Sequence, residues 1–508
     1  MRAPRTGRGR LLSVLVLATA VAVFTATVPL LRGWFDLRVY HGAVDAWVHH
    51  GGRLYDYRVP GTAYGFTYPP FAAVAMLPMA LLGLHAAVAV GLLVNLAATA
   101  SVLRALLPDR VRAHGWYGVA VTVCLLALLE PVRDTFSFGQ VNLVLLALVL
   151  GDAVPLAAGR ERRWAGTGIG LAAAIKLTPA IFVVLLLLAG RRRAAATAAG
   201  VALAATALAA RAAPDASRFY WTEAVWDTTR VGRLSYVSNQ SLQGVLARLA
   251  EPGVPSRAAW ALAALAVLAL WVRRVRRALA GDDLLGAFAL TGLAACLVSP
   301  ITWVHHLVWL LPSLAILVES GLRRRRLLRL AGVLYVLLCS SVVWLWTDDA
   351  SGPAGLVGSN AYVWITLGLL AGLPVGQSRA IRPTRRRITR ATAPAPSTAA
   401  PAIRPARPGR PTEESGPPDA TEAPEYAEAP GRAEAAAPVA VAPADSAAGP
   451  AASDADVAAE AAADADPVPA DCAAGPAWAT GRGGRSDPTG STRPAASKPQ
   501  SRSERASS

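Results

Sequence analysis

The sequence carries little charge for its length. Charged residues make up 16% of the 508 residues, hydrophobic residues make up 54%, and the mean hydropathy is +0.39. Soluble globular proteins contain about 25% charged residues, so this scarcity excludes an ordinary soluble protein. It is typical of a polytopic membrane protein, in which apolar runs of about 17–25 residues cross the bilayer as helices that satisfy their own backbone hydrogen bonds.

Cysteine is scarce as well. Cys124, Cys296 and Cys339 fall inside apolar runs, and Cys472 lies in the C-terminal part of the chain. None of these cysteines has metal-ligand spacing or an obvious disulfide partner. The cysteines therefore predict neither a metal centre nor a disulfide framework.

Acidic residues are outnumbered by basic ones. The chain has 50 Lys and Arg residues against 33 Asp and Glu residues, which gives a net charge of +17. Because the arginines gather in short clusters between apolar runs, as in cytoplasmic loops, we interpret them as a basic surface facing anionic lipid rather than as a nucleic-acid site. The main clusters lie at 191–193, 273–277, 323–326 and from Arg379 onwards.

The apolar runs predict twelve passes through the membrane. The first follows an arginine-rich start and is about twenty residues long, too long for the apolar region of a signal peptide. We expect it to be a transmembrane helix running from inside to outside, and an even number of passes would leave both termini in the cytoplasm. The runs cover 11–31, 71–83, 86–103, 116–129, 141–158, 166–189, 194–213, 258–272, 284–298, 303–319, 327–346 and 360–376.

The expected architecture is an all-α polytopic bundle of about 10–13 transmembrane helices with a long first external loop. Residues 1–10 would be a basic cytoplasmic N-terminus and residues 11–376 the transmembrane catalytic domain. Residues 377–508 are dominated by Ala, Pro, Ser, Gly and charges. Such a segment cannot bury enough apolar surface to offset its ordering entropy, so we expect a disordered cytoplasmic tail.

Two arginine clusters conflict with a simple count of passes. With every run crossing the membrane, Arg104, Arg110 and Arg112 and the cluster at 160–163 would come out on the external side. A short re-entrant helix near 71–83, together with a break at 176–179, would reverse the intervening segment. Both arrangements remain open at the level of the sequence.

An acid follows the first apolar run directly. The stretch WFDLRVY, residues 34–40, places Asp36 two residues before Arg38, with aromatic residues on both sides. Nothing in the packing of a membrane bundle requires an acid there, so Asp36 is our candidate catalytic base. In the loop 33–68 that contains it, residues 39–50 (VYHGAVDAWVHH) favour a short amphipathic helix at the interface. An ordinary solvated loop is the alternative.

Further polar residues lie inside or at the ends of the apolar runs, where they are costly and therefore functional candidates. Gln140 and Asn142 in FGQVN could hold a sugar or phosphate, although Asn142 could instead cap a helix. Lys176 in IKLTP needs an anion or a water cavity nearby, unless it is a structural lysine that snorkels. Asn239 and Gln240 in SNQS carry donors and acceptors that suit sugar hydroxyls.

Two adjacent histidines, His305 and His306, end the stretch SPITWVHH. Adjacent residues on a helix point about 100° apart, so the pair would be poor co-ligands of a metal. We interpret one imidazole as contacting a phosphate and the other as facing the bundle, with a metal site as the alternative. Before the FGQVN stretch, Glu130, Arg133 and Asp134 are expected to pair with one another.

Taken in order, the motifs WFDLRVY, LYDY, YPPF, FGQVN, IKLTP, SNQS and SPITWVHH resemble those of one enzyme family. This family is the GT-C glycosyltransferases of family 87, the polyprenyl-phosphate-mannose-dependent α-(1→2) mannosyltransferases of actinobacteria. The resemblance covers about residues 11–376 and leaves out the tail.

The resemblance implies a multi-pass enzyme of the cell membrane with its active site on the extracytoplasmic side. The donor would be polyprenyl-phosphate-mannose, which is a substrate rather than a cofactor. The acceptor would be a mannose of a membrane glycolipid or lipoglycan of the cell envelope. Transfer would invert the anomeric centre from a β-linked donor to an α-linked product. Neither a nucleotide sugar, a metal, another cofactor nor a nucleic-acid partner is expected, and the sequence has no glycine-rich phosphate loop.

The resemblance assigns the role of base to Asp36 and places one of the two histidines, slightly in favour of His305, near the donor phosphate. The chemistry agrees, because a hydroxyl is a weak nucleophile that must lose its proton to a base. The departing phosphate needs cations and hydrogen-bond donors, which Arg38, Lys176 and His305 could supply. The aromatic residues that could stack on sugar faces, or instead anchor the interface, are Trp34, Tyr40, Tyr55 and Tyr68.

Two other classes of protein compete with a transferase. A transporter or flippase of a lipid-linked sugar would also have many helices and buried polar residues, but it would more often show paired halves with matching broken helices. This sequence has one clear break, at 176–179. A membrane scaffold that acts through its tail would leave Asp36 and the histidines without a purpose.

Overall fold

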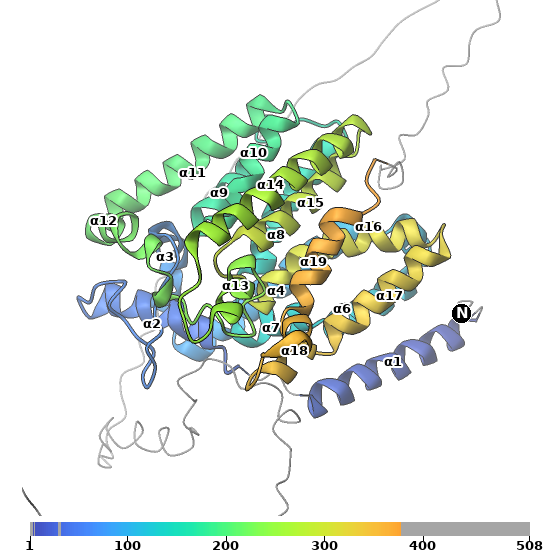
Figure 1. Ribbon diagram of the computed structural model, residues 1–508, viewed down its shortest axis with the longest axis horizontal. Coiled ribbons are helices and arrows are strands. Elements are labelled where there is room, and N and C mark those ends of the chain that lie inside the picture. The colour runs from blue at the N-terminus through green and yellow to red at the C-terminus, as the bar shows by residue number, and fades with distance from the viewer. Residues whose placement is uncertain (1–3, 5, 29–31, 377–508) are drawn as a thin grey trace, which may run out of the picture. The chain divides into compact units, whose positions relative to one another are not determined.

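The computed structural model describes residue 4 and residues 6–28 and 32–376, so the predicted tail lies outside the described residues. The described part is built from α-helices and short 3-10 helices (η) and contains no β-strand (Figure 1). This confirms the all-α expectation. The elements are α1 (Gly7–Thr27), α2 (Phe35–His49), α3 (Pro70–Met76), η1 (Leu77–Leu81), α4 (Leu84–Leu106), α5 (Asp109–Arg112), α6 (Trp116–Leu128), α7 (Glu130–Phe138), α8 (Asn142–Ala157), α9 (Thr167–Ile175), η2 (Thr178–Ala180), α10 (Ile181–Leu188), α11 (Arg192–Ala212), α12 (Pro214–Thr222), η3 (Ala224–Trp226), η4 (Thr228–Arg230), α13 (Leu242–Ala250), α14 (Arg257–Ala280), α15 (Leu284–Val298), η5 (Val304–Leu310), α16 (Leu311–Gly321), α17 (Arg325–Cys339), η6 (Val342–Trp346), α18 (Gly352–Gly358) and α19 (Ala361–Gly372).

Several of these helices are long and apolar enough to cross a membrane. Among the described residues, α1, α4, α11, α14 and the continuous segment of η5 and α16 meet this test, and two bent pairs raise the number from 5 to as many as 7. The pair α7 and α8 bends by 116°, and the pair α18 and α19 bends by 60°. With four shorter apolar helices beside them, the chain is a multi-pass membrane protein.

The apolar run at 166–189, predicted as one span with a break, folds back on itself instead. Helix α9 ends at Ile175, and Pro179 of the IKLTP motif lacks the N–H that would continue the helix. A Cβ on Gly166 would meet the carbonyl oxygen of Ala194 at 2.1 Å, and one on Gly170 would meet that of Ala198 at 2.5 Å. Helices α9 and α11 therefore run in parallel and pack directly on each other, and α10 returns along α11. The result is a hairpin with Lys176 near its tip.

The run at 71–83 does not extend away as a single straight helix either. It forms α3 and then η1, which packs back along α2. The ring Nε2 of His41 lies 2.8 Å from the carbonyl oxygen of Leu82, and that of His49 lies 2.9 Å from that of Ala80. This fold-back matches the short re-entrant helix near 71–83 that one of the two open arrangements contains.

The arginine clusters at 104–112 and 160–163 conflicted with the count of twelve membrane passes. In the structure they lie beside other arginine clusters that are expected in the cytoplasm. Arg191 pairs with Glu161 at 3.3 Å, which joins the loop after α8 to the loop before α11. Arg110 donates to the carbonyl oxygen of Leu322 at 3.1 Å, next to the 323–326 cluster. These two contacts agree with the arrangement in which a re-entrant helix and a hairpin reverse the intervening segment.

Helix α15 is the centre of the larger core. Nearly all of its residues are buried, and it packs against α8, α10, α14, α16, α19 and η5, as expected of a helix that is apolar all round. The chain leaves its C-terminal end through Ser299 and Pro300 and enters η5, which carries both histidines. The best-packed helix in the structure thus positions the SPITWVHH segment.

A second, smaller core forms within the first long loop. Tyr40, Tyr55, Phe66 and Tyr68 pack with Tyr220 of α12, with ring centroids of neighbouring pairs 5.3–6.3 Å apart. Aromatic groups in such edge-on and stacked arrangements contribute more than their buried area alone. The predicted short helix is present as α2, which begins at Phe35 rather than at Val39. This small core holds the helix that carries Asp36.

Candidate active site

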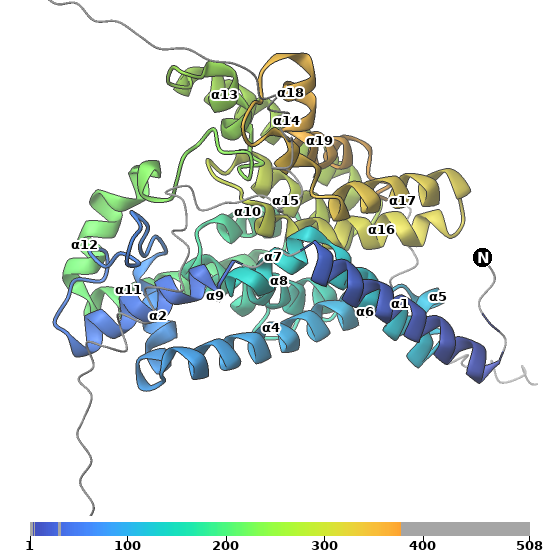
Figure 2. The same cartoon turned by 90° about the horizontal axis from the view of Figure 1, so that it is seen from below.

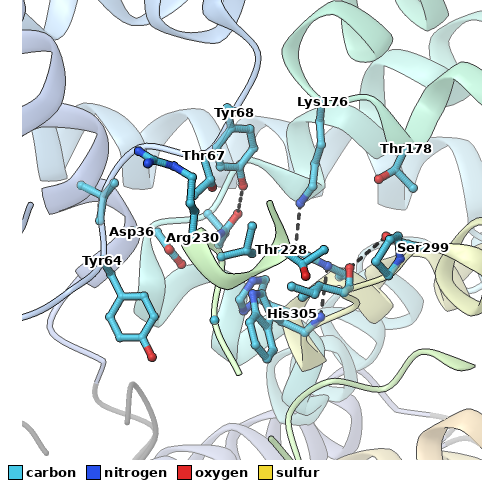
Figure 3. Close-up of a pocket in the computed structure, with 18 of the residues that line it drawn as sticks. Asp36, Tyr64, Thr67, Tyr68, Lys176, Thr178, Thr228, Arg230, Ser299 and His305 are labelled. Carbon is cyan, nitrogen blue, oxygen red and sulfur yellow. Dashed lines mark hydrogen bonds between the residues drawn. The ribbon is translucent and has the colours of Figure 1, made fainter. Parts of the chain in front are cut away.

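A hollow of about 280 Å³ lies where these two cores meet. Figure 3 shows it surrounded by side chains from separate parts of the chain: Asp36 from α2, Tyr68 from the segment before α3, Lys176 from the hairpin and His305 from η5. Six residues predicted for the site line it together, namely Asp36, Tyr68, Gln140, Lys176, His305 and His306.

The direction of Asp36 is set by where α2 begins. Gly33 and Trp34 have positive φ values of 56° and 51°, which turn the chain sharply into the helix. Two hydrogen bonds hold this turn on α7: the Trp34 N–H donates to the carbonyl oxygen of Ser137 at 2.9 Å, and the Arg32 N–H donates to its Oγ at 2.7 Å. Asp36 in the first turn then faces the hollow.

Arg38, predicted to neutralise the departing phosphate, does not line the hollow and is exposed. Residues two apart on a helix point to nearly opposite sides. Because the helix starts at Phe35 and includes both residues, Arg38 faces away from Asp36. The structure does not bring this predicted cation to the site.

The carboxyl group of Asp36 is incompletely satisfied. Its Oδ2 is enclosed and has no hydrogen-bond partner among the described residues. Burial raises the pKa of Asp36 from the ordinary 3.8 to about 7, against the lowering effects of a side-chain hydrogen bond with Gln140 and of the charge of Lys176. A carboxyl group with a pKa near neutrality and an unused acceptor oxygen is suited to act as a general base.

Gln140 is the hub of a hydrogen-bonded chain behind the hollow. The hydroxyl of Tyr40 donates to that of Tyr68 at 3.0 Å, which donates to Oε1 of Gln140 at 3.0 Å. Gln140 follows Gly139, which has a φ of 70° and touches Leu37 so closely that a Cβ there would lie 2.6 Å from the Leu37 Cβ. This glycine permits the sharp bend between α7 and α8 and so presents Gln140 to Asp36.

Lys176 reaches the hollow from the tip of the hairpin. Its Nζ donates to Oδ1 of Asn142 at 3.1 Å and lies 2.8 Å from Nε2 of His306. The ammonium group is also 5.2 Å from the centre of the Tyr68 ring, within the range of a cation–π contact. A lysine held in this way offers a positive charge to a bound anion.

The two histidines have different surroundings. His306 accepts from the Trp303 N–H through Nδ1 at 3.1 Å and contacts Lys176 through Nε2. His305 packs edge-on against Phe138, with ring centroids 5.0 Å apart, and both of its ring nitrogens are buried without a partner among the described residues. The described residues contain no group of three or more His, Cys, Asp or Glu residues that could hold a metal.

Arg230 of η4 lines the hollow and was not anticipated from the sequence. Its guanidinium donates to the carbonyl oxygen of Tyr55 at 2.7 Å and lies 5.1 Å from the centre of the Phe219 ring. Asp227 and Thr228 line the hollow beside it. No motif in the 223–241 segment pointed to these residues, because tertiary contacts alone decide where they lie.

The other predicted residues lie outside the lining. Tyr40, Tyr55 and Asn142 are buried behind the hollow and support Tyr68 and Lys176; Tyr55, for example, donates to the carbonyl oxygen of Tyr68 at 2.8 Å. Asn239 and Gln240 are completely buried and bond to backbone groups. The structure does not bring these last two to the hollow.

The fold and the hollow describe a multi-pass membrane protein whose hollow combines a carboxyl group with cationic and neutral nitrogen groups. Comparison with known proteins identifies the family to which the chain belongs. A family model described as glycosyltransferase family 87 matches residues 66–300. The chain belongs to glycosyltransferase family 87, and the resemblance drawn from the motifs is confirmed.

Relatives from mycobacteria match a longer part of the chain than the family model does. A polyprenol-phosphate-mannose-dependent alpha-(1-2)-phosphatidylinositol mannoside mannosyltransferase of Mycolicibacterium smegmatis is 37% identical over 317 residues, which cover 57% of this chain and 71% of the relative. The protein of the same name from Mycobacterium tuberculosis is 33% identical over 390 residues, 71% of this chain and 89% of the relative. No solved structure matches the chain.

Proposed function

We propose that the protein transfers mannose from polyprenyl-phosphate-mannose to a mannose hydroxyl of a membrane glycolipid or lipoglycan. The names of the relatives support this donor, and they specify phosphatidylinositol mannosides as the acceptors of those enzymes. The observation that carries the proposal is the enclosed and unpartnered Oδ2 of Asp36 in a hollow shared with Lys176 and His305.

In the proposed reaction, Asp36 Oδ2 accepts the proton of the acceptor hydroxyl. At the same time, the oxygen of that hydroxyl attacks the anomeric carbon of the donor. The bond between that carbon and the phosphate oxygen breaks, and polyprenyl phosphate leaves with the electron pair. Attack from the face opposite the leaving group turns a β-linked donor into an α-linked product, and the acceptor position would be O2, giving an α-(1→2) linkage. A general base of this kind contributes about 10²–10⁴-fold to the rate.

The departing phosphate gains negative charge as the bond breaks. Lys176 supplies a positive charge, and His306 and Asn142 hold its Nζ in place. Neither ring nitrogen of His305 has a partner among the described residues, and one of them can donate to a phosphate oxygen. Such preorganised groups stabilise developing charge strongly in an enclosed site, so the proposal requires neither a metal nor another cofactor.

We further propose that the reaction takes place on the extracytoplasmic side of the membrane. Helix α8 begins at Asn142, beside the hollow, and ends at Ala157, just before the arginines at 160–163. Helix α15 runs the opposite way, from the arginines at 273–277 to the SPITWVHH segment. The hollow thus lies at the other end of these helices from the arginine loops, which the positive-inside rule assigns to the cytoplasm.

Membership of a glycosyltransferase family removes the reason to prefer a transporter or flippase. The test is an assay with membranes that contain the full chain, radiolabelled polyprenyl-phosphate-mannose and glycolipid acceptors. We expect Asp36→Asn to lower transfer by about 10²–10⁴-fold. The matched control is Asp45→Asn, on the same helix but away from the hollow, where Asp45 pairs with His50 at 3.3 Å. It should retain activity.

Two outcomes would contradict this function. If Asp36→Asn retains most of the activity while the protein inserts normally, Asp36 is not the base. If purified protein uses GDP-mannose as donor in the absence of any polyprenyl phosphate, the lipid-donor assignment fails. Acceptors lacking the hydroxyl at O2 test the linkage separately, because they should accept no mannose.

A further inference from the structure

A second hollow, of about 860 Å³, lies between α4 and α8, away from the candidate active site. Figure 2 shows these two helices side by side. The part of the hollow along the helices is apolar, and its residues on α4 recur with helical spacing at Val94, Ala97, Ala98 and Ser101. Opposite them stand residues of α8, including Ala147 and Gly151. We call this space the α4–α8 groove.

Three arginines close one end of the α4–α8 groove, namely Arg104, Arg112 and Arg162. All three are exposed. Arg112 pairs weakly with Asp109 at 3.9 Å and donates to the carbonyl oxygens of Arg104 and Leu107. Arg104 and Arg162 form no ion pair with any described residue.

One acid also lines the groove, and it is already occupied. Asp152 accepts from the Ile169 N–H at 2.9 Å and faces the backbone N–H groups at the start of α9. It therefore serves as a cap for a neighbouring helix and leaves the charge at the arginine end uncompensated. The groove thus joins an apolar channel to a cationic end.

We propose that the α4–α8 groove binds an anionic diacyl phospholipid of the inner leaflet. The phosphate would contact Arg104 and Arg162, and an acyl chain would lie along the apolar wall of α4 and α8. Charge complementarity and position favour this occupant, because the arginine end lies among the loops that gather at the cytoplasmic end of the bundle. Basic pockets between membrane helices on that side bind the head groups of acidic lipids.

Gly151 offers a direct way to block the groove. It is exposed on α8, and a Cβ built on it meets no atom within 4 Å. A leucine there would project into the acyl-chain channel without a clash, and leucine favours a helix more than glycine does. The matched control is Gly200→Leu on α11, where a Cβ also meets no atom within 4 Å and which does not line the α4–α8 groove.

The experiment is native mass spectrometry of the full-length protein released from detergent after titration with phosphatidylglycerol or phosphatidylcholine. We expect the wild type and Gly200→Leu to retain one phosphatidylglycerol in preference to phosphatidylcholine, and Gly151→Leu to lose it. The double variant Arg104→Ala with Arg162→Ala should bind phosphatidylglycerol about 25-fold more weakly, at about fivefold for each arginine. Its control is Arg192→Ala with Arg193→Ala, two exposed arginines outside the groove.

Several results would overturn the proposal. Equal retention of phosphatidylglycerol and phosphatidylcholine, or an equal loss of affinity in both arginine pairs, would show that no specific head-group site exists. Loss of binding in Gly151→Leu with full binding in the groove-arginine variant would mean an apolar channel without an anion site. A preference for polyprenyl phosphate over phosphatidylglycerol that Gly151→Leu abolishes would replace the proposed occupant of the groove with another lipid.

Discussion

Two buried carboxyl groups in this protein have opposite surroundings. Glu130, at the start of α7, is completely buried, yet both of its oxygens accept hydrogen bonds, one from the Trp344 indole N–H and one from the Tyr362 hydroxyl. Asp36 is less buried as a residue, but its Oδ2 has no partner among the described residues. A buried carboxyl group whose two oxygens both accept hydrogen bonds stabilises the fold. A carboxyl oxygen without a donor, beside a hollow, is instead available to a ligand.

The same distinction separates two glutamines. Gln240 donates to the carbonyl oxygens of Val237 and Ser359, and its Oε1 accepts from the N–H groups of Tyr362 and Val363. It joins the 223–241 loop to α19 and has no capacity left for a sugar. Gln140, in contrast, lines the hollow. The sequence alone could not distinguish the two glutamines, because both are polar residues beside apolar runs. Their hydrogen-bond partners in the structure distinguish them.

The sharpest test of this comparison sets Asp36→Asn against Glu130→Gln. Asp36→Asn should lower transfer by about 10²–10⁴-fold, because a general base is lost, with thermal stability in detergent unchanged or raised. Glu130→Gln places an amide opposite the Trp344 donor and should cost about 1–3 kcal/mol of stability. Its transfer rate per folded molecule should stay near the wild-type rate.

This comparison fails if the two variants behave alike. A Glu130→Gln protein that is stable but inactive would indicate that Glu130, and not Asp36, is the catalytic base. An Asp36→Asn protein that is active but unstable would make Asp36 the structural acid of the two.

A second prediction concerns the anion-binding side of the site. Lys176→Met should lower kcat/KM by about 10²–10³-fold, the usual effect of removing one group that stabilises developing charge. Arginine at this position should restore little, because its planar group cannot occupy the place of a single ammonium held by Asn142 and His306. The measurement is the initial rate at several donor concentrations. A change in acceptor KM alone would contradict a role for Lys176 at the donor phosphate.

The two histidines extend the comparison of partnered and unpartnered groups. His305→Phe removes nitrogens that bond to nothing in the structure, so it should lower transfer about tenfold, the value of one hydrogen bond to a charged group, and leave stability unchanged. His306→Phe removes a bond to the Trp303 N–H and the contact with Lys176, and it should lower stability as well as transfer. Equal and negligible effects on transfer would remove both histidines from the mechanism.

The sequence predicted more of the site than of the path of the chain. Asp36, Lys176 and the histidines could be found because polar groups at apolar runs are rare and costly. The hairpin of α9 and α10 could not be told from a kinked span, because hydropathy measures the length of a run and not its direction. Only close contacts such as that of Gly166 with Ala194 reveal that the run turns back.

The misplaced residues have equally physical causes. Arg38 was expected to act beside Asp36, but both residues lie in α2, and two helical positions turn their side chains about 200° apart. Arg230 was missed because its position rests on the carbonyl oxygen of Tyr55 and the ring of Phe219. Neither contact leaves a pattern in the residues around Arg230. Glu130 and Asp134 were expected to pair locally with Arg133, yet their closest partners come from other segments, as with Arg32, 3.6 Å from Asp134.

The smallest expected effect is on the pH dependence of transfer. Because the pKa of Asp36 is raised to about 7, the carboxyl group keeps its proton below that pH and becomes a base above it. We therefore expect kcat/KM to rise about fourfold between pH 6.5 and pH 8 and then to level off. The positive charge of Lys176 lowers the pKa of Asp36, so Lys176→Met should move this rise to higher pH, whereas Glu130→Gln should leave it in place. A profile that is flat down to pH 5, as for a carboxyl group of ordinary pKa, would mean that Asp36 is not the group whose ionisation limits transfer.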